Sequence, residues 1–178
     1  MSDWKLLNTS TASGAANASF TDLTGYKIFK FVFIDVNPVT DNSNFTFQVN
    51  ASGQTGYNET ITSTYFSAIH FEDGSYIALA YDTGRDQAQG TSYQPLFGGV
   101  GNGADESGAG EMFLFNPAST TYVTHFYCNA QYYNGSSASD NAYAAGYINV
   151  TAAITSIDFK MSSGNFDGTI KQYGLVAG

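Results

Sequence analysis

The chain has 178 residues, a length that suits a single domain with a continuous hydrophobic core. Hydrophobic residues make up 43% of it, which argues against a disordered chain, whereas charged residues make up only 12%. The 6 Lys and Arg residues against 15 Asp and Glu give a formal net charge of −9. Because nucleic acids and anionic membranes bind through cationic side chains, we expect neither as a partner.

The N-terminal residues have no basic stretch followed by an apolar one, so we expect no signal peptide there. The single cysteine, Cys128, excludes an internal disulfide, and its place in the apolar run from Tyr122 predicts a small buried core residue. No apolar stretch approaches the ~18 residues that a membrane-spanning helix needs.

Alternation of residues with a period of two dominates the chain and predicts β-strands. The clearest case is Tyr26–Val36, where Phe29, Phe31 and Phe33 share one face and Asn37-Pro38 is expected to end the strand. The same pattern predicts ten further strands: Trp4–Thr11, Ala18–Leu23, Phe45–Asn50, Ile61–Phe71, Tyr76–Tyr81, Glu111–Phe115, Tyr122–Ala130, Tyr143–Val150, Ile154–Met161 and Thr169–Leu175.

Turn-forming residues separate these strands. Asp73-Gly74 and Asn134-Gly135 are dipeptides typical of tight hairpins, and Ser163-Gly164-Asn165 and Asp167-Gly168 also predict turns. Two longer segments, Asp82–Gln94 and the glycine-rich Gly98–Gly110, read as irregular loops. Long loops in a compact domain are usually functional or form interfaces.

About ten short strands without any helical periodicity predict an all-β fold. We expect one domain over residues 1–178, an antiparallel β-sandwich of jelly-roll type. Seven phenylalanines are expected to be largely buried in it: Phe31, Phe33, Phe45, Phe47, Phe115, Phe126 and Phe159.

The chain contains none of the common catalytic or metal-binding motifs, so we expect no enzymatic activity and no cofactor. Both histidines, His70 and His125, lie in predicted strands and are expected to be structural or interface residues. Carboxylates gather near the two loops: Asp82, Asp86, Asp105, Glu106 and Glu111. A loop calcium site and paired-acid catalysis remain alternatives to plain solvated turns.

Tyrosines beside loops are the candidate contact residues, because a tyrosine ring packs well while its hydroxyl stays hydrated. A neighbouring subunit and a glycan are both possible occupants of such a surface. The candidates are Tyr93, Tyr132, Tyr133, Asn134 and Asn102.

The C-terminal run Ile157–Leu175 carries an I-x-F-x-x-SSGN pattern followed by GTI and YG. It resembles the closing hairpin of a domain found in structural proteins of tailed bacteriophages, especially marine ones. The order of three earlier segments is also similar to that family: Trp4–Leu7, Phe20–Leu23 and Pro38–Asn42. Leu114-Phe115-Asn116-Pro117 matches it in the middle of the chain.

The resemblance implies a jelly-roll-like structural protein, made in the host cytoplasm and located in the virion. It transfers no catalytic residue. We expect a self-associating capsid decoration or cement protein, a homotrimer that also contacts other virion proteins. The alternative is a tail-fibre or tail-tip protein that binds a host surface glycan.

Overall fold

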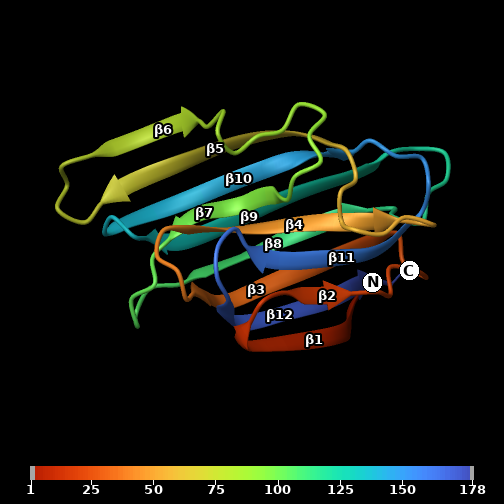
Figure 1. Ribbon diagram of the computed structural model, residues 1–178, viewed down its shortest axis with the longest axis horizontal. Helices are drawn as coiled ribbons and strands as arrows, with labels where there is room; N and C mark the ends of the chain where they lie inside the picture. Colours follow the sequence, from red (N-terminus) through yellow and green to blue (C-terminus); the bar gives the residue numbers. More distant parts are fainter. Residues whose placement is uncertain (1–2, 177–178) are drawn as a thin grey trace.

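The computed structural model describes residues 3–176, and these form twelve β-strands and no helix (Figure 1). The strands are β1 (Trp4–Ala15), β2 (Ala18–Phe20), β3 (Ile28–Pro38), β4 (Ser43–Ala51), β5 (Ile61–Phe71), β6 (Ile77–Tyr81), β7 (Gln94–Val100), β8 (Gly108–Phe115), β9 (Thr124–Asn134), β10 (Ala138–Ile148), β11 (Ile154–Met161) and β12 (Phe166–Leu175). The expected all-β class is therefore confirmed.

Every strand pairing is antiparallel. One row of eight strands runs β1-β12-β3-β8-β9-β10-β5-β6, and a shorter row runs β7-β4-β11-β2. A single register pair, Val100 with Asn134, joins β7 to β9 and so connects the two rows. Because β1 and β2 at the ends of the longest path lie next to each other, the sheet is nearly closed.

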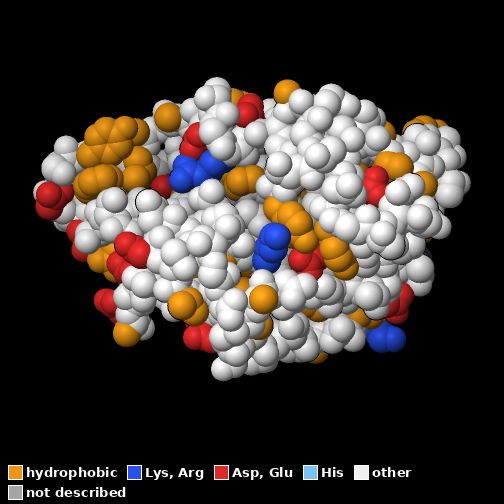
Figure 2. Space-filling view, in the orientation of Figure 1, with side chains coloured by type: hydrophobic (Ala, Val, Ile, Leu, Met, Phe, Trp, Pro, Cys, Tyr) orange, Lys and Arg blue, Asp and Glu red, His pale blue; other side chains and the backbone are white. Residues whose placement is uncertain are grey.

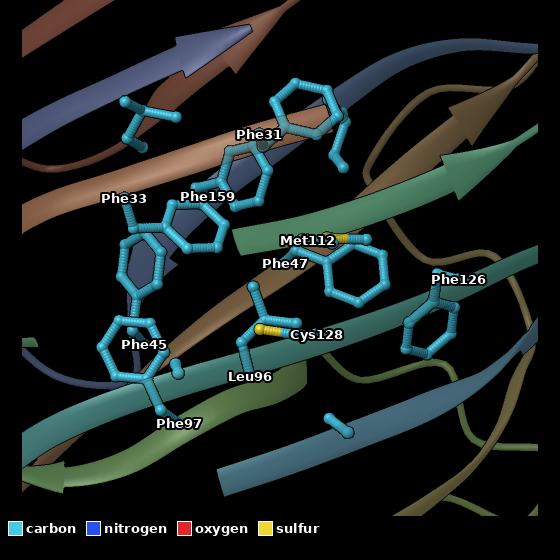
Figure 3. Packing of buried hydrophobic residues seen from close by; sticks show 14 of the residues in the cluster. Phe31, Phe33, Phe45, Phe47, Leu96, Phe97, Met112, Phe126, Cys128 and Phe159 are labelled. Carbon is cyan, nitrogen blue, oxygen red and sulfur yellow. The ribbon is translucent and has the colours of Figure 1, made fainter. Parts of the chain in front are cut away.

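The core is a cluster of aromatic side chains between the two rows (Figure 3). Phe33 of β3 lies with its ring centroid 5.2 Å from that of Phe45 on β4 and 5.3 Å from that of Phe159 on β11. Phe47 of β4 meets Phe126 of β9 at 4.8 Å. Most of these pairs are edge-to-face, the arrangement that the charge distribution of aromatic rings favours.

Strand β3 shows how the alternating sequence sets these contacts. Phe29, Phe31 and Phe33 are buried on the inner face, as the period of two predicts. Asp35 then adopts a positive φ of 52°, and the pairing with β8 shifts between Phe33 and Val36. This bulge inserts a residue, so Val36 again points into the core.

The predicted strands all exist, and the bounds of Ile61–Phe71 and Ile154–Met161 are confirmed. Strand β7 was not expected, because Pro95, Gly98 and Gly99 made its sequence resemble a loop. The predicted loop Gly98–Gly110 is consequently wrong at both ends, since its first residues belong to β7 and its last to β8. The glycines suit strands here because neighbouring groups approach the backbone closely; a Cβ on Gly110 would lie 2.5 Å from the carbonyl oxygen of Asn129.

Three further expectations need correction. Phe115 is half-exposed, because Met112 and Leu114 take the inward positions of β8 and leave Phe115 on the outer face. Asp167-Gly168 is no turn but lies within β12, where Gly168 has a φ of +140° at a register shift against β3. The predicted strand Tyr26–Val36 is displaced by two residues, because β3 runs from Ile28 to Pro38 and ends with Asn37-Pro38 as expected. The other six phenylalanines and Cys128 are buried as predicted.

Candidate functional site

The unequal rows leave part of the longer one uncovered on its inner side. Ile61, Ser63 and Tyr65 of β5 are buried, but the next two inward residues of that strand, Ser67 and Ile69, are half-exposed. The strands β6, β5 and β10 thus extend beyond the shorter row, and Figure 1 shows β6 and β5 projecting past β7. We call the region under this projection the polar cleft; it has a volume of about 380 Å³.

The polar cleft is lined from five segments of the chain. Its walls are Ser67, Ile69, Ala78 and Ala80 from β5 and β6, Tyr76 and Tyr81 at the ends of β6, Asn134, Ser136 and Asp140 from the β9–β10 hairpin, and Asp82, Thr83, Arg85, Gly98, Gly99 and Asn42 on the opposite side. Figure 2 shows a Lys/Arg patch beside Asp/Glu side chains, next to the hydrophobic patch at the β5–β6 end of the molecule.

Asp140 is the acidic wall of the polar cleft. Its side chain is on the inner face of β10 and only 6% exposed, and its Oδ1 has no hydrogen-bond partner among the described residues. Burial raises the pKa of this carboxyl above its ordinary value, an effect that nearby Tyr132, Ser67 and Arg85 partly offset. A buried acceptor without a partner costs folding free energy, and a ligand hydroxyl that reached it would recover that cost.

Arg85 faces Asp140 as the basic wall. Its guanidinium forms an ion pair with Asp82 through Nη1, while its buried Nε has no partner within residues 3–176. The loop between β6 and β7 holds it, because Gln94 Nε2 donates to the Arg85 carbonyl at 2.9 Å. Gly98 makes room for it, since a Cβ at Gly98 would lie 2.4 Å from the Arg85 Nε.

Two tyrosines lie beneath these charges. Tyr65 and Tyr132 are buried, and neither hydroxyl is in hydrogen-bonding geometry with another described group. Burial raises the pKa of both phenols, so both remain neutral. The Arg85 guanidinium lies 5.7 Å from the centroid of the Tyr65 ring, a cation–π contact.

The outer side of the same strands has the opposite character. Apart from Asp140, which points inward, β5, β6, β9 and β10 contain no Asp, Glu, Lys or Arg. Their outward residues include exposed aromatic and aliphatic side chains, which we call the neutral outer face: Phe66, Ile77, Leu79, Tyr81, Tyr127 and Tyr143. Ile77 and Leu79 are 69% and 75% exposed.

A hollow of about 470 Å³ interrupts the neutral outer face. It forms over Ala145 and Gly146 of β10, where a methyl group and a bare backbone leave space beside the larger Phe115, Tyr127 and Tyr147. Gly146 is required there, because a Cβ would come within 2.3 Å of the Thr62 carbonyl oxygen. His125 lies in β9, which confirms its prediction as a strand residue, and its exposed side chain lines the hollow.

The five predicted contact residues do not form one surface. Tyr132 is 2% exposed, which contradicts its role as a surface contact; the alternation of β9 turns it inward and Tyr133 outward. Asn134 lines the polar cleft. Tyr93 donates to the buried Asp158 at 2.8 Å and lies under Lys160, while Asn102 is exposed on the loop before β8.

The carboxylates expected near the loops are dispersed. Asp82 pairs with Arg85, Asp86 accepts from the Tyr81 hydroxyl at 2.5 Å, and Glu111 lies 3.8 Å from Lys30. Glu106 accepts from the Gly103 amide at 2.6 Å and so fastens its own loop. Within residues 3–176, no group of three or more His, Cys, Asp or Glu side chains is placed to hold a metal ion.

Asp140 and Arg85 were not among the predicted site residues. The sequence did carry a signal for each, because Asp140 is the one charged residue in four strands and Arg85 is the one arginine in the chain. No family model matches the chain, and no curated protein does. Residues 3–176 include no helix with the length and hydropathy of a membrane span.

Proposed function

We propose that the chain is a non-enzymatic structural protein of a virus particle, a capsid decoration or cement protein that assembles with its own copies through the neutral outer face. The observation that carries this proposal is the distribution of charge. The chain has a formal net charge of −9, yet the outward residues of β5, β6, β9 and β10 carry none of it. Interfaces are enriched in aromatic residues and depleted of charge in the same way.

A second copy is the occupant that suits this face. Two acidic molecules repel each other wherever their carboxylates meet, so copies associate best where that charge is missing. Strand β6 pairs with β5 on one side and ends the row, and it contains neither Lys nor Pro. Natural proteins usually protect such an edge with these residues, unless another chain covers it.

The strand order supports a sandwich of jelly-roll type. Eight strands pair first with last in chain order: β1 with β12, β2 with β11, β3 with β8, and β4 with β7. This is one long antiparallel hairpin, and the pairings of β12 with β3 and of β11 with β4 roll it up. The β5–β6 and β9–β10 hairpins are then insertions that widen one sheet. Jelly rolls of this kind occur in viral capsid and lectin domains.

The resemblance to tailed-phage structural domains is part of the same proposal. Its SSGN segment is the turn between β11 and β12, where Gly164 has a φ of +71° and a Cβ would meet the Thr40 hydroxyl at 2.4 Å. A glycine is therefore required at that point of the motif. Closed symmetry is usual for self-associating chains, and the proposed state is a homotrimer, as is frequent for jelly rolls in virions.

We also propose that the chain is not an enzyme, because its candidate carboxylates are held by structural partners. Each acid considered for paired-acid chemistry, Asp105 apart, has a structural partner: Asp82, Asp86, Glu106 and Glu111. Glycoside hydrolysis needs two carboxylates facing one bond.

Mass spectrometry of purified particles tests the role. We expect the chain in particles of the virus that encodes it, in copy numbers that scale with the capsid shell. Its absence from particles would overturn the proposal. A low copy number restricted to the tail, with binding to host cells, would instead support the tail-fibre or tail-tip alternative. The polar cleft is the observation that favours this second candidate.

A further inference from the structure

We propose that the polar cleft binds a neutral sugar unit, with Asp140 and Arg85 as the groups that meet its hydroxyls. This inference does not depend on the proposed assembly, because the cleft opens on the inner side of β5, β6 and β10 and the neutral outer face lies on the other side.

The unpartnered polar atoms are the first argument. Asp140 Oδ1 is an acceptor without a donor, and Arg85 Nε is a donor without an acceptor, in the part of the chain that the structure describes. Both residues line the cleft. A hydroxyl both donates and accepts, so adjacent hydroxyls of one sugar ring match a buried donor and a buried acceptor together. Charged partners make such hydrogen bonds about twice as strong as neutral ones.

The charge of the cleft is the second argument. Arg85 is paired with Asp82, and Asp140 adds a second carboxylate, so acidic groups outnumber basic ones. This balance disfavours phosphate, sulfate and carboxylate ligands. Neutral saccharides carry no charge that the carboxylates would repel.

The shape and the rim are the third argument. The volume of about 380 Å³ is within the range of about 300–1,000 Å³ of small-molecule sites. Ala78 and Ala80 have small side chains that leave space on the β6 side of the cleft, and Tyr76 at its rim is 52% exposed. Exposed tyrosine rings offer the apolar surface on which the C–H face of a sugar packs.

Saturation-transfer NMR with the full chain tests the inference. The probes are a panel of neutral mono- and disaccharides, with sialic acid and inorganic phosphate as anionic comparators. We expect transfer to at least one neutral saccharide and none to the anions. Asp140→Asn, which removes the charge and keeps the shape, and Tyr76→Ala at the rim are each expected to weaken binding at least tenfold.

Leu79→Lys is the matched control, because Leu79 lies on the outer face of β6 and not in the cleft. It is expected to bind saccharide like the unaltered chain and to lose self-association. Tyr76→Ala is expected to bind saccharide more weakly and to keep self-association. If Asp140→Asn does not fold, as judged by circular dichroism, Tyr76→Ala decides alone. The inference is overturned if no neutral saccharide binds, if the anions bind better, or if the folded cleft variants bind unchanged.

Discussion

Phe66 of β5 stacks on Tyr143 of β10 on the solvent side of the sheet, with ring centroids 5.0 Å apart and planes inclined by 10°. Both side chains remain about two-fifths exposed, at 41% and 40%. Phe113 and Tyr127 form a second stack on the same side of the sheet, with centroids 4.8 Å apart. Packed rings have little conformational freedom left to lose, so a contact on this face would cost little side-chain entropy.

The Phe66–Tyr143 stack is expected to stabilise the fold only modestly. We predict a coupling of about 0.5–1.5 kcal/mol between Phe66→Ala and Tyr143→Ala, the usual value for an aromatic pair. Urea unfolding of both single variants and the double variant, in the Leu79→Lys background to limit self-association, measures it. Strictly additive effects would show that the rings stack without stabilising each other.

Phe159 has a larger role, because its ring contacts those of Phe20, Phe31, Phe33 and Phe45. Phe159→Ala is expected to lower the free energy of unfolding by about 3–5 kcal/mol, the cost of a cavity left by a buried ring. Tyr122→Ala is the control, since Tyr122 is 72% exposed, and it should stay within about 0.5 kcal/mol of the unaltered chain. Similar urea midpoints for both variants would contradict the described core.

Gly110 is expected to tolerate no side chain. A Cβ there would lie 2.5 Å from the Asn129 carbonyl oxygen and 2.6 Å from the Ala130 Cα, where β8 pairs with β9. Gly110→Ala should cost about 1–3 kcal/mol by forcing the strands apart. Gly53→Ala, at a φ of +80° with open space around it, should cost about 1–2 kcal/mol through backbone strain alone. Thermal unfolding measures both costs. The amide resonances of β8 and β9 should shift in Gly110→Ala but not in Gly53→Ala, and a shift in both variants would refute the steric account.

Asp140 makes stability depend on pH in an unusual direction. Its pKa is raised above 3.8 by burial, so the folded chain holds this proton more tightly than the unfolded chain does. The free energy of unfolding therefore falls as the pH rises from 3.8 through the raised pKa. Asp140→Asn is expected to gain stability relative to the unaltered chain across that window and to keep the gain at neutral pH.

Asp73→Asn is the comparison of opposite sign. Hydrogen bonds from Ser75 lower the pKa of Asp73, so its stabilising effect is present at neutral pH and is lost as the pH falls through the lowered pKa. Asp73→Asn should thus lose stability at neutral pH and match the unaltered chain in acid. Urea midpoints at acidic and neutral pH measure the stability of both variants. An equal loss of stability for Asp140→Asn at the two pH values would contradict the burial assigned to Asp140.

Alternation in the sequence was sufficient to predict eleven of the twelve strands, and inward phenylalanines mark several of them, among them β3, β4 and β11. It failed at β7, where Pro95 and the glycine pair leave only Leu96, Phe97 and Val100 as a signal. It also failed on the phase of β8, since Phe113 and Phe115 look as apolar as Met112 and Leu114. The register of β8 with β3 and β9 determines that Met112 and Leu114 point inward, and the sequence of β8 alone does not reveal that register.

The candidate sites were harder to predict because they join distant segments. Arg85 comes from the loop after β6 and Asp140 from β10, and the two meet only because the β9–β10 hairpin pairs with β5. The neutral outer face was easier to predict from the sequence. Its four strands lack outward charges, which is visible once the inward phase of each strand is known.

Sedimentation velocity of three proteins tests self-association through the neutral outer face most directly. The unaltered chain is expected to sediment as a trimer of its 19.0 kDa subunit, and Leu79→Lys as a monomer, because a lysine at this 75% exposed position places charge in the contact. Val39→Lys, altered at a 59% exposed site in the turn after β3, should remain trimeric. A monomeric unaltered chain would contradict the account, and so would a Leu79→Lys protein that sediments as a trimer.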